Sequence, residues 1–290
     1  MRTIKSPKSV NSVNKRRLNK LLANRLAVFG LFLFVAVIVL CLAAPLLTDY
    51  DPSRMDMALR YAPPSREHIF GCDQGGRDIF ARLLYGGRIS ILIGLISALS
   101  ANLLGAAIGC VAGYFGGMVD QIIIYISEIF RCFPVNMLTL IIMGLSGQGV
   151  VIMMIVFTAT GWSGTMRQVR SRVLSLKQEV FVESCRATGI PSASIMFRHI
   201  LPNAMGVFII NITTNVANYV LSEAGLSFLG MGVPKGVPTW GNMLNAARSL
   251  DVMQNHALLW VLPGVAIALF VLGVNFFGDG LRDVFDVSED

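Results

Sequence analysis

The side chains best suited to chemistry in this sequence are polar groups set within long apolar stretches. Four of them recur at i, i+4, i+7 and i+11 and therefore share one stripe of a helix: Asn211, Asn215, Asn218 and Ser222. Amide groups in lipid are costly unless they are hydrogen-bonded. The stripe predicts either hydrogen bonds between helices or the polar wall of a path through the membrane, and the spacing leaves both interpretations open.

An acid and a base, Glu128 and Arg131, stand inside another apolar stretch. A charged side chain near the bilayer centre costs roughly 2.5–3.5 kcal/mol on insertion scales. Their spacing of i, i+3 allows an ion pair on one helix face that would reduce this cost. We expect a structural pair that faces the helix bundle, or an Arg131 side chain that reaches the membrane interface. Contact with a transported substrate is the alternative.

Signatures of catalysis, nucleotide binding and metal binding are missing from the sequence. The dipeptide Gly-Lys does not occur, so the chain cannot supply the phosphate-binding loop G-x-x-x-x-G-K-[ST]. Neither H-E-x-x-H nor G-x-S-x-G occurs, and the histidines are far apart in sequence. We therefore predict that the chain is not an enzyme and that it has no catalytic residue, no metal site and no cofactor of its own.

The elements that must position the polar groups are long, uncharged helices. Hydrophobic residues make up 54% of the 290 residues and charged residues only 14%, whereas a soluble domain usually carries about 25% charged residues. The apolar residues occur in blocks long enough to cross a bilayer. The sequence predicts an all-α membrane protein with six transmembrane helices at residues 26–47, 89–114, 121–144, 150–166, 203–221 and 257–277.

The second of these spans carries a glycine at every fourth position: Gly105, Gly109 and Gly113. Small residues on one face of a membrane helix let a neighbouring backbone approach closely. We expect this face to be a helix contact.

The connections between the spans indicate which side of the membrane each faces. Residues 1–25 form a basic tail with no acid, and residues 167–202 form a second basic loop. Counting six crossings from a cytoplasmic amino end puts this loop and the tail 278–290 in the cytoplasm, and the polar loops 48–88 and 222–256 outside, as the positive-inside rule favours. The net charge of +7 therefore reflects the basic segments beside the membrane, and we expect no nucleic-acid partner.

The apolar run 26–47 is longer than the 7–15 apolar residues of a secretory signal, so we expect it to be a transmembrane helix rather than a signal peptide.

The second basic loop contains the segment EVFVESCRATGIPSASIMFRHILPN, residues 179–203. Residues 179–188 favour a helix, Gly189 can end it in a left-handed conformation, and Pro191 suits the first turn of a second helix. Two short helices are predicted to meet at Gly189 at the membrane surface, and Pro202 is predicted to break the chain before the fifth span.

This segment resembles the E-A-A-x-x-x-G…L-P motif of the membrane subunits of binding-protein-dependent ABC importers. The matching residues are Glu183, Ser184, Cys185, Gly189, Leu201 and Pro202, with Ser and Cys at the two alanine positions. The chain also resembles the second-permease (C-type) subgroup of dipeptide, oligopeptide and nickel importers from about residue 20 to 287, through HIFGCDQGGRDIFARLLYGGRISILIG, AGYFGGMVD, EAGLSFLGMGVP, PTWGNML and NFFGDGLRDVFD.

The resemblance implies a type I importer permease in a bacterial-type cytoplasmic membrane, with both chain ends in the cytoplasm. The matched loop residues would couple it to two ATP-binding subunits, which would bind ATP and Mg²⁺. A homologous second permease subunit and an extracytoplasmic solute-binding protein would complete the assembly. Dipeptides, longer peptides, glutathione, nickel complexes and metallophores all stay open as the solute. The alternative is a self-contained secondary transporter, a class that often shows intramembrane acids and internal repeats.

Overall fold

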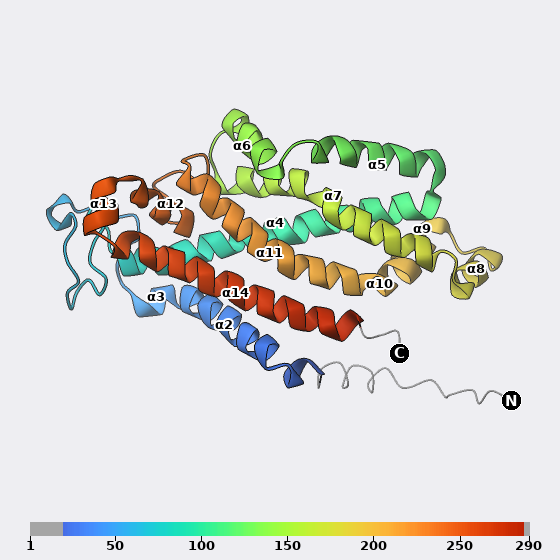
Figure 1. The fold of residues 1–290 in the computed structure, drawn as a ribbon, viewed down its shortest axis with the longest axis horizontal. Helices are drawn as coiled ribbons and strands as arrows, with labels where there is room; N and C mark the ends of the chain where they lie inside the picture. The colour runs from blue at the N-terminus through green and yellow to red at the C-terminus, as the bar shows by residue number, and fades with distance from the viewer. Residues whose placement is uncertain (1–19, 287–290) are drawn as a thin grey trace.

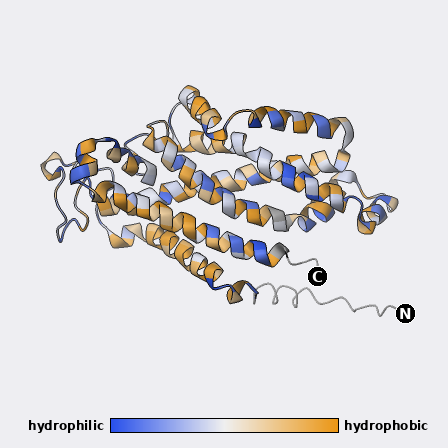
Figure 2. Cartoon of the chain, in the orientation of Figure 1, coloured by the Kyte–Doolittle hydropathy of each residue, from blue (hydrophilic) through white to orange (hydrophobic). Residues whose placement is uncertain are grey.

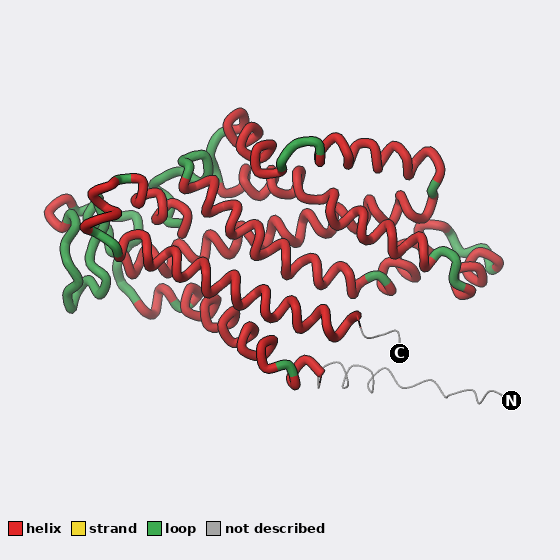
Figure 3. The backbone as a smooth tube through the Cα atoms, viewed as in Figure 1, coloured by secondary structure: helices red, strands yellow, loops and turns green. Residues whose placement is uncertain are grey.

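The computed structural model describes residues 20–286, and these fold into a bundle of long helices with short helical segments at both ends (Figures 1 and 3). The long helices are α2 (Arg25–Leu42), α4 (Ile79–Phe115), α5 (Gly117–Arg131), α6 (Val135–Ser146), α7 (Val150–Leu176), α11 (Met205–Phe228) and α14 (Leu258–Asp286). The short segments are α3 (Ala44–Leu47), η1 (Met57–Leu59), α8 (Val180–Ala187), α9 (Ser192–Ser194), the π-helix η2 (Ile195–Ile200), α10 (Leu201–Asn203), α12 (Trp240–Leu244), η3 (Asn245–Arg248) and α13 (Leu250–Asn255).

Four of the long helices, α2, α4, α7 and α14, are long and apolar enough to cross a membrane. Two further pairs of helices are each bent at a short break, and the number of candidate spans rises to six if each pair counts as one span. The first pair is α5 with α6, bent by 82°, and the second joins residues 192–203 to residues 208–228 with a bend of 72°. The predicted all-α membrane class is confirmed. Of the basic tail, residues 1–19 lie outside the described part of the chain, as do residues 287–290 of the other tail.

Two helices extend well beyond the predicted spans. Helix α4 begins ten residues before position 89, because the carboxylate of Asp78 accepts a hydrogen bond from the Ala81 N–H and caps the helix. Residues 79–88 are therefore helical, although the sequence assigned them to the loop 48–88. Helix α7 continues from 166 to Leu176, so the first part of the predicted loop 167–202 is helical as well.

The remaining spans also differ from the prediction in their ends. Helix α11 extends to Phe228 rather than 221, and α14 extends to Asp286 rather than 277. The predicted span 121–144 is not one straight helix, because it breaks between Arg131 and Val135 at a proline that cannot donate a backbone hydrogen bond. At the first span, the helix of 26–47 is divided into α2 and α3.

Helix α4 lies at the centre of the bundle and packs along α7 through the predicted glycine face (Figure 1). A Cβ atom built on Gly105 would lie 2.5 Å from the Trp162 carbonyl oxygen, and one on Gly109 would lie 2.4 Å from the Met166 carbonyl oxygen. Both distances are shorter than real Cβ contacts, so only glycine allows the two backbones this close. The predicted close helix contact is confirmed.

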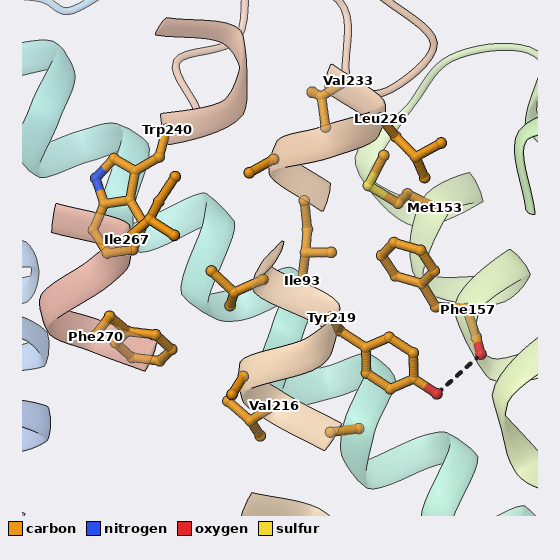
Figure 4. Packing of buried hydrophobic residues seen from close by; sticks show 14 of the residues in the cluster. Ile93, Met153, Phe157, Val216, Tyr219, Leu226, Val233, Trp240, Ile267 and Phe270 are labelled. Carbon is orange, nitrogen blue, oxygen red and sulfur yellow. Dashed lines mark hydrogen bonds between the residues drawn. The ribbon is translucent and has the colours of Figure 1, made fainter. Parts of the chain in front are cut away.

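The main apolar core lies where α4, α7, α11, α12 and α14 meet (Figure 4). The ring of Phe157 on α7 stacks on Tyr219 of α11, and the Tyr219 hydroxyl donates to the Phe157 carbonyl oxygen at 3.4 Å. Trp240 and Phe270 are almost completely buried nearby. The outer helices are rich in hydrophobic residues (Figure 2). Many of these are exposed, such as Phe32 at 67% and Leu145 at 85%, as expected of surfaces covered by lipid or by another subunit.

Candidate functional site

Residues 177–203, here called the α8–α10 lobe, project from one end of the bundle, and α12 and α13 lie at the opposite end (Figure 1). Helix α8 forms one arm of the lobe. The continuous helical stretch of α9, η2 and α10 forms the other arm. The lobe therefore consists of the two helices that the sequence predicts.

The turn between the two arms is centred on Gly189, whose φ angle is 75°. The Gly189 N–H donates to the Arg186 carbonyl at 3.0 Å, and the Ile190 N–H donates to the Cys185 carbonyl at 3.1 Å. These two bonds form a Schellman motif, in which a left-handed residue ends a helix. The predicted left-handed helix end is confirmed.

The inner face of the lobe is fixed to α4 and α7. Val182 is fully buried in an apolar cluster with Val169, Val173, Ile195 and Ile200. Partly buried Cys185 and Leu201 pack against the same cluster.

Tyr114, at the end of α4, makes polar contacts with both arms of the lobe. Its hydroxyl donates to the Ser192 hydroxyl at 3.3 Å, and the guanidinium of Arg186 lies 5.3 Å from the centre of its ring. Because these contacts join both arms to α4, the lobe is attached to the bundle as one unit.

The outer face of the lobe is exposed and partly apolar. Val180 is 75% exposed and Phe181 is 38% exposed. Glu183 and Ser184 are also exposed, and within the described residues the Glu183 carboxylate makes no hydrogen bond or ion pair. The Glu183 side chain is therefore accessible on the outer face of the lobe. Pro202 is exposed next to the 72° bend.

Replacing Gly189 with valine is expected to open the lobe, whereas Gly189→Asn should leave it nearly intact. Nothing lies within 4 Å of a Cβ atom at this position, so the substitution tests the backbone conformation alone. A left-handed residue other than glycine costs about 1–2 kcal/mol, asparagine tolerates it best, and a β-branched residue tolerates it poorly. Tryptic cleavage after Arg186 should be about 5–30 times faster in Gly189→Val than in the wild type. Equal cleavage rates for the valine and asparagine variants would contradict this account.

The stripe of polar residues on α11 divides between the interior and the surface. The amide of Asn215 donates to Oδ1 of Asn102 at 3.4 Å, and the Thr165 hydroxyl donates to the same oxygen at 2.6 Å. Asn102 is fully buried, so this hydrogen-bonded group joins α4, α7 and α11. Asn211 is half-buried, and its Nδ2 atom has no partner among the described residues.

The other two stripe residues lie on a different surface. Asn218 is exposed, and Ser222 lines an open cavity of about 380 Å³ between α6 and α11. Asn136, Met137 and Leu140 of α6 line the same cavity. Asn215 therefore has the interhelical hydrogen bond that one interpretation predicts, and Asn218 and Ser222 have the accessibility that the other requires.

The charged residues on α5 pair with α7 rather than with each other. The Glu128 carboxylate lies 3.6 Å from a guanidinium nitrogen of Arg167, and Asp120 forms a bidentate ion pair with Arg170. Arg131 is exposed. The expected pairing of Glu128 with Arg131 is therefore wrong. The sequence analysis placed Arg167 in a loop, but α7 continues through this position and faces α5.

A buried acid on α11, Glu223, was missed by the sequence analysis, which placed it in the loop 222–256. Its side chain is completely buried and accepts hydrogen bonds from the hydroxyls of Ser90 and Ser227, each at 2.8 Å. The Ser90 hydroxyl oxygen also accepts from the Trp240 N–H at 3.1 Å. This network joins α4, α11 and α12. The i, i+4 spacing of Glu223 and Ser227 is the one sequence signal that could have placed both on a helix.

Comparison with known families identifies the kind of protein that carries these features. A family model described as "Binding-protein-dependent transport system inner membrane component" matches residues 105–288. The chain belongs to this family. A second model, described as the N-terminal TM domain of oligopeptide transport permease C, matches residues 14–64. As a family member, the chain is a multi-pass membrane permease subunit of an ABC importer and is itself non-catalytic.

Relatives of known name span nearly the whole chain. A protein of Brucella ovis named as a peptide permease is 39% identical over 93% of this chain and 90% of its own length. The oligopeptide transport system permease protein OppC of Bacillus subtilis is 36% identical over 91% of this chain and 86% of its own length. Among solved structures, a chain of the inward-facing MetNI methionine ABC transporter matches with a TM-score of 0.57 at 17% identity, covering 70% of this chain and 96% of that chain. At this identity the likeness concerns the fold.

Proposed function

We propose that this permease forms half of the translocation pathway of an importer for dipeptides or oligopeptides. A second, homologous permease subunit forms the other half, and the surface carrying Asn218 and Ser222 faces it across the cavity between α6 and α11. Two separate ATP-binding subunits hold ATP and Mg²⁺ and drive the transport. An extracytoplasmic solute-binding protein delivers the solute. The peptide class follows the names of the relatives that span the chain.

The observation that carries this proposal is the exposed outer face of the α8–α10 lobe. Val180 and Phe181 present exposed apolar side chains beside the carboxylate of Glu183, which has no partner in residues 20–286. An apolar patch with a polar rim is typical of a protein contact. We assign this face to an ATP-binding subunit, whose closure would push the lobe and the helices joined to it.

The proposed orientation follows from the charges. The lobe and both chain ends lie in the cytoplasm of a bacterial-type cell membrane, because the basic tail and the basic residues of α7 and the lobe then share one side. Residues 48–78 and the segment from α12 to α13 lie on the outer side, where a solute-binding protein would dock.

Purification and transport of the intact complex test this function. The chain should co-purify with ATP-binding subunits and a second permease, and vesicles that contain the complex and its binding protein should accumulate a labelled dipeptide or pentapeptide only with ATP. ATP-binding subunits that lack the P-loop lysine serve as the control and should abolish uptake. ATP-independent uptake by this chain alone would instead indicate a secondary transporter. Uptake of a nickel complex or glutathione but no peptide would overturn the solute class.

A further inference from the structure

A polar cavity of about 250 Å³ lies at the end of the molecule opposite the α8–α10 lobe. The segment between α3 and the first turn of α4 forms one wall, and α12 with η3 forms the other. Three bases and one acid line it: Arg77, Arg82, Lys235 and Asp73. The lining therefore has an excess of positive charge.

The two arginines share a single carboxylate, that of Asp73, which also accepts backbone hydrogen bonds. One oxygen of Asp73 accepts from the backbone N–H groups of Gly75 and Arg77, and the other lies 3.3 Å from Nε of Arg77 and 3.4 Å from Nε of Arg82. Arg77 is only 8% exposed, and its Nε is buried without a hydrogen-bond partner among the described residues. Arg82 already donates from Nη1 to the Pro52 carbonyl oxygen at 3.0 Å. The buried Arg77 guanidinium, with one donor that no hydrogen bond uses, therefore favours a further anion beside the cavity.

The opposite wall holds Lys235 at the mouth of the cavity. The side-chain amide of Asn242 donates to the carbonyl oxygens of Val233, Pro234 and Val237 and so fixes the loop that carries Lys235. Lys235 itself is exposed. An anion that enters the cavity therefore passes a lysine at the mouth and meets two guanidinium groups below it.

We propose that this cavity receives a carboxylate side chain, aspartate or glutamate, of the extracytoplasmic solute-binding protein. This inference rests on the proposed function, because the proposed orientation puts the cavity on the outer side of the membrane. Guanidinium groups bind carboxylates with short, charge-assisted hydrogen bonds, often in pairs. The volume of about 250 Å³ suits one side chain and is smaller than the roughly 300–1,000 Å³ of pockets that enclose a whole ligand.

The wall formed by α12 gives such a contact a route to the translocation pathway. The backbone N–H of Trp240, the first residue of α12, donates to Ser90, and Ser90 donates to Glu223 on α11. Five residues earlier on the same helix, about one and a half turns, α11 carries the polar surface around Asn218. Docking at this cavity is therefore connected to the helix that lines the proposed pathway.

Charge reversal at Lys235 tests the proposal in the reconstituted complex with its own ATP-binding subunits and binding protein. The readout is the binding-protein concentration that gives half-maximal stimulation of ATP hydrolysis. Lys235→Glu should raise this concentration about tenfold, because a charge at the rim of an interface governs association. Arg66→Glu makes the same charge change on an exposed residue of the outer segment 48–78 that does not line the cavity, and it should leave the midpoint unchanged. Arg77→Gln should raise the half-maximal binding-protein concentration more than Lys235→Glu does. The thermal stability of the Arg77→Gln variant checks that it still folds.

The possible outcomes separate this inference from the proposed function. Equal midpoints for Lys235→Glu and the wild type would overturn the carboxylate contact. A changed dependence on solute at saturating binding protein, with an unchanged midpoint, would assign the carboxylate to the solute and would also overturn it. Absence of any stimulation in the wild-type complex would contradict the proposed function instead.

Discussion

Replacing Phe181 with aspartate is expected to abolish stable association of this permease with its ATP-binding subunits while the permease itself still folds. Phe181 lies on the outer face of the α8–α10 lobe, whereas the contacts that hold the lobe to α4 and α7 come from its inner face. Aromatic anchors at protein contacts commonly contribute about 2–4 kcal/mol, so the affinity should fall by roughly 30-fold to 1,000-fold. Co-purification of the ATP-binding subunits and ATP-driven uptake should both be lost.

A matched set of variants controls this experiment. Val180→Asp changes a neighbouring residue that is 75% exposed and should weaken the same association with less effect on the fold. Leu250→Asp makes the same kind of change at a residue that is 72% exposed on α13, at the other end of the molecule, and should retain the ATP-binding subunits. Normal recovery of these subunits with both Phe181→Asp and Val180→Asp would show that the lobe is not the contact.

The second large effect is expected at the glycine contact between α4 and α7. A Cβ atom at Gly109 would lie 2.4 Å from the Met166 carbonyl oxygen, which is backbone and cannot move aside as a side chain can. Overpacking typically costs about 1–3 kcal/mol, and each kcal/mol lowers the melting temperature of a chain of this size class by about 2–4 °C. Gly109→Ala should therefore melt roughly 2–12 °C lower than the wild type, and Gly109→Leu should not yield a folded permease.

Gly164 provides the matched control for this prediction. It lies on α7, and nothing is within 4 Å of a Cβ atom built on it. Alanine is favoured over glycine within a helix by about 0.5–1 kcal/mol, so Gly164→Ala should melt at the same temperature as the wild type or slightly higher. Thermal unfolding of the purified protein in detergent measures both variants. A Gly109→Ala protein as stable as Gly164→Ala would contradict the close backbone contact.

The sequence was sufficient to predict features that depend on local or periodic chemistry. The apolar blocks predicted an all-helical membrane chain, the spacing of Gly105 and Gly109 predicted a helix contact, and Gly189 predicted a left-handed helix end. Each of these depends on residues close together on one helix or on the backbone freedom of a single residue. Their physical cause is therefore visible in a short stretch of sequence.

Features that depend on distant partners could not be predicted in this way. Arg82 and Arg167 were assigned to loops because they are charged, but each lies within a helix and forms an ion pair with a carboxylate from another segment. Glu223 was missed for the same reason, because it is charged and its partner Ser90 lies far away in the sequence, on α4. Pro134 marks where the predicted span 121–144 breaks, but a proline alone does not set the 82° angle between α5 and α6.

Helix α4 touches both surfaces that are assigned to partners. Its last turns hold the α8–α10 lobe through Tyr114, and its first turns supply Ile79 and Arg82 to the outer cavity. The helix is unbroken over 37 residues, which is about 55 Å at 1.5 Å per residue. An unbroken helix of this length can carry an axial shift or a tilt from one end toward the other. In the proposed orientation, an event on one side of the membrane would thus reach the other side through a single covalent element, with no relay of separate parts between them.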